Sequence, residues 1–262
     1  MKIATWNINS VRIREALLSR FVTEHTPDVL CLQETKVEDQ HFPHALITRL
    51  GFNHCIFTGE KSYNGVAILS KLPLKLHATY DMIANGHKRH IAAELPDGTL
   101  LHNFYVPAGG DIPDPAVNQK FDEKLRFVDA MQDWAREFKS HHKVIAVGDF
   151  NIAPLEQDVW SSRQLRHVVS HTEIEREKFN AAQRSGQWVD ALRSLVPHEQ
   201  KLYSWWSYRN RDWAASDRGR RLDHVWLSPA LKSDLKHGYI HRDARGYESP
   251  SDHVPVVVEL AS

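Results

Sequence analysis

Two short runs of apolar residues constrain the fold of this chain more than any other feature. They are residues 28–33 (DVLCLQ) and 143–151 (KVIAVGDFN), and each is too short to be a core helix. Both are typical of core strands, and Gly148-Asp149 breaks the second. Turn-forming residues separate further short strands, which we expect at 2–8, 53–57, 64–70, 75–80, 90–95, 100–106, 221–228 and 254–260.

Helices are expected between these strands. Residues 13–25 place Ile13, Leu17 and Phe21 on one helical face, and apolar residues recur at helical spacing over 121–138. Residues 155–200 are polar and indicate short helices. The pattern predicts an α/β fold in which two sheets pack together and helices cover them. Because the chain shows no repeat, low-complexity tract or linker, we expect one domain over residues 1–262.

Composition excludes several classes of protein. Apolar residues make up 42% and charged residues 25%, which is typical of globular proteins and not of disordered chains or coiled coils. The 33 basic and 33 acidic residues balance, which excludes a nonspecific polycation but permits a locally basic face. No apolar run approaches the roughly 18 residues of a membrane span. Asn7, Asn9 and Ser10 interrupt any signal core, and Cys31 and Cys55 are too few for a disulfide framework. We therefore expect a bacterial-type cytoplasmic protein that does not enter a membrane.

Polar clusters lie at the ends of apolar strands. Four are Trp6–Asn9, Gln33–Lys36, Gly148–Asn151 and Ser251–His253, and a fifth, Arg221–His224, opens a strand. A single cluster of this kind is most often a local turn, because Asn and Asp favour turns. Five clusters that each offer oxygen ligands or a titratable group instead indicate a site presented by strand ends.

These clusters favour a hard metal ion. Carboxylates and amides without cysteine suit Mg²⁺ or Mn²⁺ better than Zn²⁺. The candidate residues are Glu34, Asp149, Asp223, Asp252, Asn7, Asn9 and Asn151. His253 could act as an imidazole that an aspartate orients. His87 and His90 have a spacing seen in zinc sites, but no HExxH or Cys/His pattern accompanies them, so they are expected at the surface, like His141 and His142.

Segment 201–222 (KLYSWWSYRNRDWAASDRGRRL) is the second informative region. It holds six basic and two acidic residues, a local charge of +4. Its interleaved aromatic residues are Tyr203, Trp205, Trp206, Tyr208 and Trp213. Aromatic faces stack on bases or sugars and arginines bind phosphates, so Arg209, Arg211 and Arg218 are candidate DNA contacts. A loop with core tryptophans and solvated arginines would give the same pattern.

Eight motifs occur in order from residue 1 to residue 260. They are WNINSVR, LQETK, YNGVAILS, NFYVPAGG, GDFNIAP, YSWWSYR, RLDH and SDHVPV. Together they resemble the exonuclease III-like abasic-site endonucleases of the endonuclease/exonuclease/phosphatase superfamily. GDFN and SDH mark only the superfamily, whereas LQETK, SWWSYR and the RLD strand point to the DNA-repair branch. The resemblance implies a four-layered α/β sandwich with the site at the mouth between its two sheets.

The resemblance also implies which residues hold the metal. Glu34 would be the principal ligand, with help from Asn7 or Asn9. Asp252 would be a second carboxylate near the ion. The implied cofactor is Mg²⁺, with Mn²⁺ able to substitute.

Further matching residues would carry the hydrolysis of a phosphodiester. Asp149 would position or deprotonate the attacking water, with Asn151 alongside. His253, oriented by Asp223, would contact the scissile phosphate, and Tyr105 would reach a phosphate oxygen.

A pocket for a flipped abasic sugar would be lined by Trp205, Arg220 and Leu222. Two departures from the family pattern lie near it. Ala108 stands where Gln or Asn is usual, so one phosphate-contacting amide is lost. His171 stands where an apolar Phe is usual beside the pocket. We therefore expect weaker incision at internal abasic sites than processing of 3′ ends.

The leading hypothesis is a monomeric DNA-repair nuclease that associates with the nucleoid when it binds DNA. It would act on double-stranded DNA with abasic sites, nicks or recessed 3′ ends, as 3′-5′ exonuclease, abasic-site endonuclease and 3′-phosphatase. One alternative is a phosphoesterase for a small phosphoester such as an inositol phosphate, against which segment 201–222 and LQETK argue. A second is a non-enzymatic nucleic-acid binder, which the intact catalytic positions disfavour. The missing signal segment and disulfides disfavour a secreted digestive deoxyribonuclease.

Overall fold

The computed structural model describes residues 1–261, which build two six-stranded sheets. The first has the strand order β11-β12-β1-β2-β4-β3 and the second the order β5-β6-β7-β8-β10-β9. The strands of the first sheet are β1 (Lys2–Asn7), β2 (Val29–Gln33), β3 (His54–Glu60), β4 (Tyr63–Ser70), β11 (Leu235–Ile240) and β12 (Val256–Leu260). Those of the second are β5 (Lys75–Ala78), β6 (His90–Glu94), β7 (Leu100–Tyr105), β8 (Val144–Asp149), β9 (Val189–Asp190) and β10 (Asp223–Leu227).

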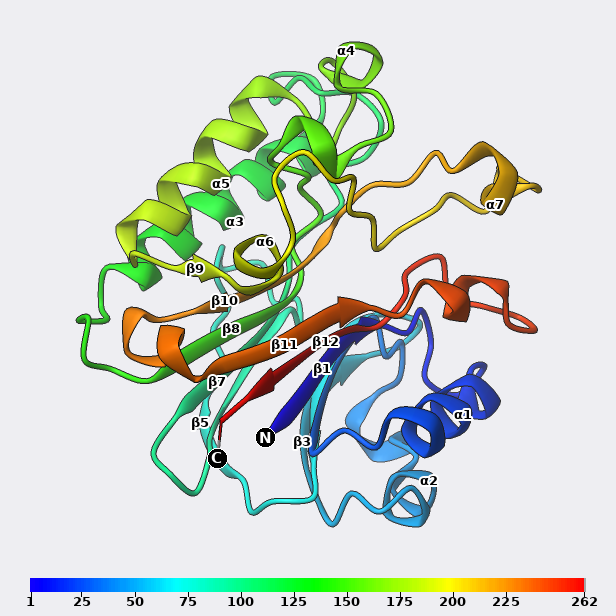
Figure 1. The fold of residues 1–262 in the computed structure, drawn as a ribbon, viewed down its shortest axis with the longest axis vertical. Coiled ribbons are helices and arrows are strands. Elements are labelled where there is room, and N and C mark those ends of the chain that lie inside the picture. The colour runs from blue at the N-terminus through cyan, green and yellow to red at the C-terminus, as the bar shows by residue number, and fades with distance from the viewer. Residues whose placement is uncertain (262) are drawn as a thin grey trace.

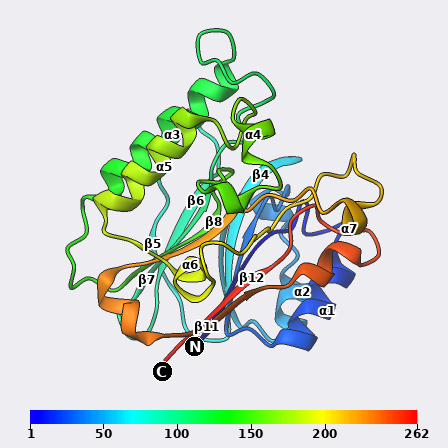
Figure 2. The same ribbon diagram turned by 45° about the horizontal axis from the view of Figure 1, so that its top comes forward.

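Helices cover the outer face of each sheet (Figures 1 and 2). α1 (Glu15–His25) and α2 (His44–Arg49) pack on the first sheet, and α3 (Gln119–Ala135) and α5 (Glu173–Ser185) pack side by side on the second. The short helices are α4 (Ser162–Leu165), α6 (Ala191–Leu195) and α7 (Trp213–Ser216). This is the expected four-layered α/β sandwich. Within residues 1–261, no helix combines the length and the apolar character that a bilayer crossing requires.

The apolar run in β2 is explained by burial on both of its faces. Val29 and Cys31 belong to the core between the sheets, whereas Leu30 and Leu32 pack in the layer that includes α1 and α2. Successive side chains of a strand point to opposite faces, so a strand inside this sandwich needs apolar residues at every position.

The two ends of the chain meet in the first sheet. β12 lies between β11 and β1 and pairs antiparallel with both. The amino group of Met1 donates a 2.7 Å hydrogen bond to the carbonyl oxygen of Leu260. The first and the last of the described strands, β1 and β12, therefore pair with each other in the first sheet.

Several elements differ from the sequence prediction, among them α2, α7, β9 and β11, which were not expected, and α5, which is longer than expected. α5 has 13 residues, longer than the short helices expected over 155–200. A capping box starts it: Thr172 Oγ1 accepts from the Glu175 amide, and the Glu175 carboxylate accepts from the Thr172 amide. β11 was not predicted, because this edge strand has the mixed sequence LKHGYI and no apolar run. The sequence of β11 does not indicate a strand, and its pairing with β12 holds it in one.

The prediction that His90 lies at the surface is wrong. His90 on β6 and His102 on β7 are both buried, and their rings are joined by a 3.0 Å Nε2–Nδ1 contact. The Tyr80 amide donates to His90 Nδ1 over 3.0 Å. Burial lowers the pKa of His90 to about 3 and the pKa of His102 well below its ordinary value. Both rings are therefore neutral in the folded protein at neutral pH.

This pair should make the fold sensitive to acid. Below pH 6.5 the unfolded chain binds protons at these histidines that the folded chain does not, so the free energy of unfolding falls as the pH falls. His102→Asn keeps an acceptor and removes one titrating group. We expect the stability lost between pH 7.5 and pH 5.0 to be about 2 kcal/mol smaller in this variant, from about 1.4 kcal/mol per pH unit below pH 6.5. Urea unfolding at both pH values tests this against the exposed control His141→Asn. Equal losses in wild type and His102→Asn would contradict it.

Candidate active site

The strand ends bring the polar clusters to one edge of the sandwich. β1 and β2 run parallel, so Asn7 at the end of β1 and Glu34 just after β2 lie at the same edge. In the second sheet β7 and β8 run parallel, and their register pairs Tyr105 with Asp149. β10 is antiparallel to β8 and begins at Asp223, directly opposite Asp149. Residues that lie far apart in sequence therefore meet here.

Gly148 permits the close approach of the strand that carries Asp149. Its φ is +140°, and a Cβ built on it would lie 1.9 Å from the carbonyl oxygen of Phe104. Only glycine fits this position. The break that the sequence shows in the apolar run of β8 is thus a packing requirement.

Asp149 is fully buried and accepts hydrogen bonds on both oxygens. Asn7 Nδ2 donates to Asp149 Oδ2 over 2.9 Å and to Glu34 Oε1 over 3.0 Å, so one amide joins the two carboxylates. Asn151 donates from Nδ2 to Oδ2 over 3.1 Å and from its backbone amide to Oδ1 over 2.9 Å. Burial raises the pKa of Asp149 to about 7, against the opposing effect of the His253 charge.

His253 is held between two aspartates. Its Nδ1 lies 2.8 Å from Asp223 Oδ2, which also accepts a 2.6 Å hydrogen bond from Ser204 Oγ. Its Nε2 lies 3.6 Å from Asp149 Oδ2. Burial favours the neutral ring, but the charges of Asp223 and Asp149 outweigh it and raise the pKa of His253 to about 10. His253 is therefore an imidazolium at neutral pH.

Glu34 occupies the other half of the site. Tyr105 donates its hydroxyl to Glu34 Oε1 over 2.6 Å, and Lys36 Nζ lies 2.8 Å from Glu34 Oε2. Burial opposes ionisation of Glu34, but Lys36 and the hydrogen bonds lower its pKa overall. Burial and the Glu34 charge raise the pKa of Tyr105 well above its ordinary value, so Tyr105 stays a phenol.

The residues around Glu34 fit a hard cation. Lys36 Nζ lies 2.8 Å from Glu34 Oε2 and 2.6 Å from Asn9 Oδ1, so a carboxylate and an amide oxygen already converge on a positive charge. Asp252 Oδ1 is 3.4 Å from Asn9 Nδ2 and adds a second carboxylate nearby. Oxygen donors of this kind suit Mg²⁺ or Mn²⁺. Asn9, expected as a ligand, thus lies beside Glu34, whereas Asn7 is occupied with bridging Glu34 and Asp149.

A cavity of about 970 Å³ opens over these groups. The catalytic candidates that line it are Glu34, Asp149, Asn151, Asp252 and His253. Residues from the aromatic and basic segment also line it, namely Trp205, Arg209, Arg218, Arg220 and Leu222. The Arg220 guanidinium lies 5.3 Å from the centre of the Trp205 ring and donates to Ser170 Oγ over 2.7 Å. The Arg218 guanidinium lies 4.7 Å from the centre of the Trp160 ring.

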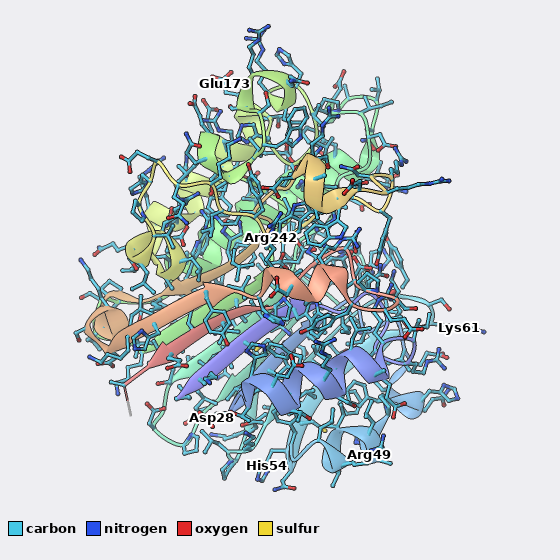
Figure 3. The ribbon with its side chains drawn as sticks, turned by 45° about the vertical axis from the view of Figure 1, so that its right-hand side comes forward. Asp28, Arg49, His54, Lys61, Glu173 and Arg242 are labelled. Carbon is cyan, nitrogen blue, oxygen red and sulfur yellow. The ribbon has the colours of Figure 1, made fainter. Side chains whose placement is uncertain are left out.

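Segment 201–222 divides between core and surface. Tyr203 and Trp206 are buried, and the Arg242 side chain, labelled in Figure 3, lies 5.6 Å from the centre of the Trp206 ring. Arg211 is exposed and lies outside the lining of the 970 Å³ cavity. Tyr208 is exposed and donates to the Pro250 carbonyl oxygen over 2.8 Å. The segment therefore supplies both structural and cavity-lining residues.

The placement of His171 beside the pocket needs correction. Its side chain is fully buried, with Nε2 2.8 Å from Ser162 Oγ and Nδ1 2.7 Å from the Ala153 carbonyl oxygen. Val169 and Ser170 line the cavity instead. Ser170 has a φ of +87°, and the chain turns inward after it, so His171 packs behind the wall.

Three residues of the site were missed from sequence. Lys36 directly follows the LQET run, so its contact with Glu34 could have been proposed from its position. Ser204, the partner of Asp223, carries no sequence signal. Arg89 is buried with its guanidinium 4.6 Å from the centre of the Tyr105 ring, and only the folded structure reveals it.

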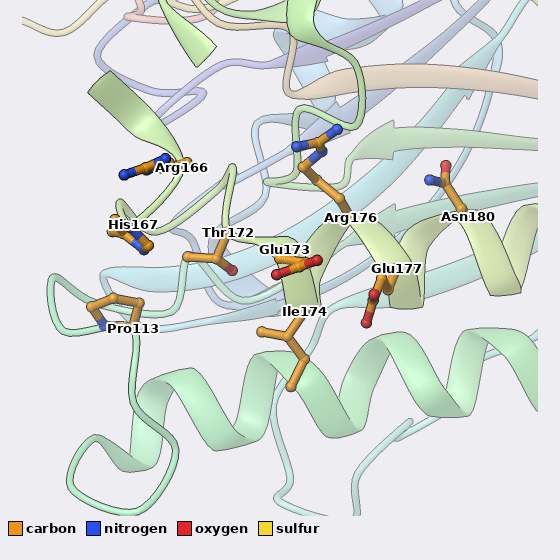
Figure 4. A pocket seen from close by; sticks show the side chains of 9 residues that line it. All are labelled: Pro113, Arg166, His167, Thr172, Glu173, Ile174, Arg176, Glu177 and Asn180. Carbon is orange, nitrogen blue, oxygen red and sulfur yellow. The ribbon is translucent and has the colours of Figure 1, made fainter. Parts of the chain in front are cut away.

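A second cavity of about 680 Å³ lies at the start of α5 (Figure 4). Arg166 and His167 line it, while the next two residues line the first cavity. The start of α5 contributes three charged lining residues, Glu173, Arg176 and Glu177 (Figure 4). None of the candidate catalytic residues lines it, so these residues gather at the first cavity.

Comparison with known proteins identifies the family. The sequence pattern of the Endonuclease/Exonuclease/phosphatase family matches residues 4–253. This chain belongs to that family. It is 32% identical to exodeoxyribonuclease III of Haemophilus influenzae, over 99% of this chain and 100% of that one.

Solved structures place the chain in the exonuclease III-like branch of the family. An AP endonuclease from Archaeoglobus fulgidus superposes with a TM-score of 0.92 at 31% identity, over the whole of both chains. The enzyme NExo from Neisseria meningitidis, described as a 3′-5′ exonuclease, gives 0.90 at 33% identity over both whole chains. NExo from Neisseria, described as a 3′ phosphatase bound to a product DNA hairpin, gives 0.91 at 32%, again over both whole chains. The chain is a hydrolase of the exonuclease III type.

The geometry predicts which variants lose turnover. Asp149→Asn removes the carboxylate charge and, because one oxygen becomes an amide nitrogen, at least one of the three hydrogen bonds that Asp149 accepts. His253→Asn removes the imidazole that Asp223 holds. We expect kcat to fall by about 10²- to 10⁴-fold in each, because both groups act mainly in the transition state. Duplex binding, followed by fluorescence anisotropy, should change little. Asp97→Asn, an aspartate near Lys143 at the other end of the molecule, is the control. Near-normal turnover in either variant would remove that residue from the catalytic set.

Proposed function

We propose that this chain is a Mg²⁺-dependent DNA-repair phosphodiesterase for double-stranded DNA with abasic sites, nicks or recessed 3′ ends. The observation that carries the proposal is the His253 imidazolium, 3.6 Å from buried Asp149 at the floor of the cavity. We also propose that the protein acts as a monomer. We further propose that residues 1–262 work as one domain in the cytoplasm, bound to the nucleoid when on DNA.

The chemistry assigned to the chain follows from its contacts. Asp149, fixed by Asn7 and Asn151, would orient the attacking water and accept its proton. His253, fixed by Asp223, would face the scissile phosphate and stabilise charge on its oxygens. Tyr105 is a phenol at neutral pH. Its hydroxyl would donate to a phosphate oxygen in place of its present hydrogen bond to Glu34.

The oxygen atoms of Glu34 and Asn9 would hold Mg²⁺, with Asp252 nearby. A bound Mg²⁺ would neutralise charge on the phosphate oxygens. Lys36 would leave its place between these two oxygens and pair with a phosphate or with solvent.

Metal dependence gives a direct test. Glu34→Gln keeps the size of the side chain and removes its charge, so it should raise the Mg²⁺ concentration for half-maximal activity by at least tenfold. Titrating Mg²⁺ at saturating duplex measures this shift. Glu38→Gln, a half-buried acid four residues further along, is the control. Full nuclease activity in excess chelator would contradict the proposal.

We propose that 3′ ends are processed faster than internal abasic sites are incised. Ala108 is exposed at the cavity, and its methyl group stands where a side-chain amide would donate a hydrogen bond to a phosphate. A terminal nucleotide frays without bending the duplex, whereas an internal abasic sugar must be extruded while both flanks stay held. The solved relatives described as a 3′-5′ exonuclease and a 3′ phosphatase support this emphasis.

Restoring the amide tests the preference. Ala108→Gln should raise kcat/KM for an internal abasic duplex about ten- to a hundredfold, the value of one hydrogen bond of about 1.5–3 kcal/mol to a charged group. Its effect on a recessed 3′ end should be small. Ala108→Leu adds bulk without an amide and should give no gain. Efficient abasic incision by the wild type that Ala108→Gln does not improve would refute the preference.

A further inference from the structure

A buried ion pair lies behind the wall of the cavity and takes no part in the chemistry above. Lys124 on α3 and Glu175 on α5 are both fully buried, with Nζ 2.5 Å from Oε1. Removing two charges from water is costly, and an apolar pair of similar size is often as stable. The contacts of this pair point to a role other than stability.

Lys124 holds two loops of the cavity at once. Besides Glu175, its ammonium donates to the carbonyl oxygen of Asn151 over 2.7 Å and to that of Ala108 over 3.2 Å. All three ammonium protons are therefore used. A Cβ at Gly109 would lie 2.8 Å from Lys124 Cδ, so the Ala108 loop rests on the lysine stem. Asn151 has a φ of +52°, an uncommon backbone conformation that this contact helps to fix.

Glu175 holds a third loop. Its carboxylate accepts from the amide of Ser170 over 2.9 Å and from the amide and hydroxyl of Thr172 over 3.1 Å and 2.6 Å. Ser170 lines the cavity with a φ of +87°, and its Oγ accepts from Arg220. The ion pair thus connects the loops of Ala108, Asn151 and Ser170 to the two long helices.

We propose that Lys124 and Glu175 are positioning residues that fix Asn151 against Asp149 and hold the cavity wall in its working shape. The proposal rests on the hydrolytic function proposed above. Because Asn151 donates twice to Asp149, a shift of its loop would misalign the group that orients water. Turnover should therefore suffer more than DNA binding.

The test uses the double variant Lys124→Met/Glu175→Gln, which leaves no unpaired buried charge. The control is Leu101→Ala, a core change at the end of β7 away from the site. For all three proteins we would measure Tm, kcat on a 3′-phosphate duplex and on bis(p-nitrophenyl) phosphate, and the duplex Kd by anisotropy. Hydrogen–deuterium exchange of segments 106–112, 149–155 and 166–173 provides a readout that needs no activity.

We expect the double variant to lose at least tenfold in kcat, with Kd within threefold of wild type and faster exchange in all three segments. Leu101→Ala should lower Tm with kcat and loop exchange unchanged. A double variant with kcat within twofold of wild type would overturn the proposal. So would an equal kcat loss in Leu101→Ala, or unchanged loop exchange in the double variant. If the wild type hydrolyses bis(p-nitrophenyl) phosphate but not the duplex, the proposed DNA substrate is refuted and the positioning role is not. If the wild type hydrolyses neither, the proposed function fails and loop exchange decides the positioning role.

Discussion

The parallel pairing of β1 with β2 and of β7 with β8 is the constraint on which the site depends. Each sheet contains one such pair, and the two pairs face each other across the core. Parallel strands end at the same edge of a sheet, so the residues after them gather at one place. The other strands of both sheets pair antiparallel and build the scaffold around this edge.

That arrangement concentrates negative charge where little water reaches. Carboxylates placed close together raise one another's pKa, and burial adds to the effect. The chain counters this by giving each carboxylate its own partner: Lys36 for Glu34, amides for Asp149 and the His253 ring for Asp223. The pKa of Asp149 and the pKa of His253 are both raised, which leaves a carboxylate base beside a protonated imidazole at neutral pH.

The sequence predicts the parts of this molecule whose signals are local. The polar cluster that directly follows an apolar strand indicated Asp149 as a candidate site residue. The chemistry of imidazole indicated His253 as another. The edge strand β11 has no apolar run, and only its neighbour orders it. The inward turn of His171 depends on the backbone at Ser170, which residue type does not reveal. Likewise, nothing along the chain indicates that Lys124 on one helix meets Glu175 on another.

The position of β12 between β11 and β1 has a consequence for biosynthesis. The N-terminal strand pairs with the last strand of the chain, and His253 lies just before that strand. Contacts between residues so far apart in sequence form late, because a long loop must close first. During translation the helices and the second sheet can begin to order while β1 still lacks one neighbour. His253 can join Asp223 and Asp149 only once the segment before β12 has been made, so a chain truncated before that segment lacks the assembled site.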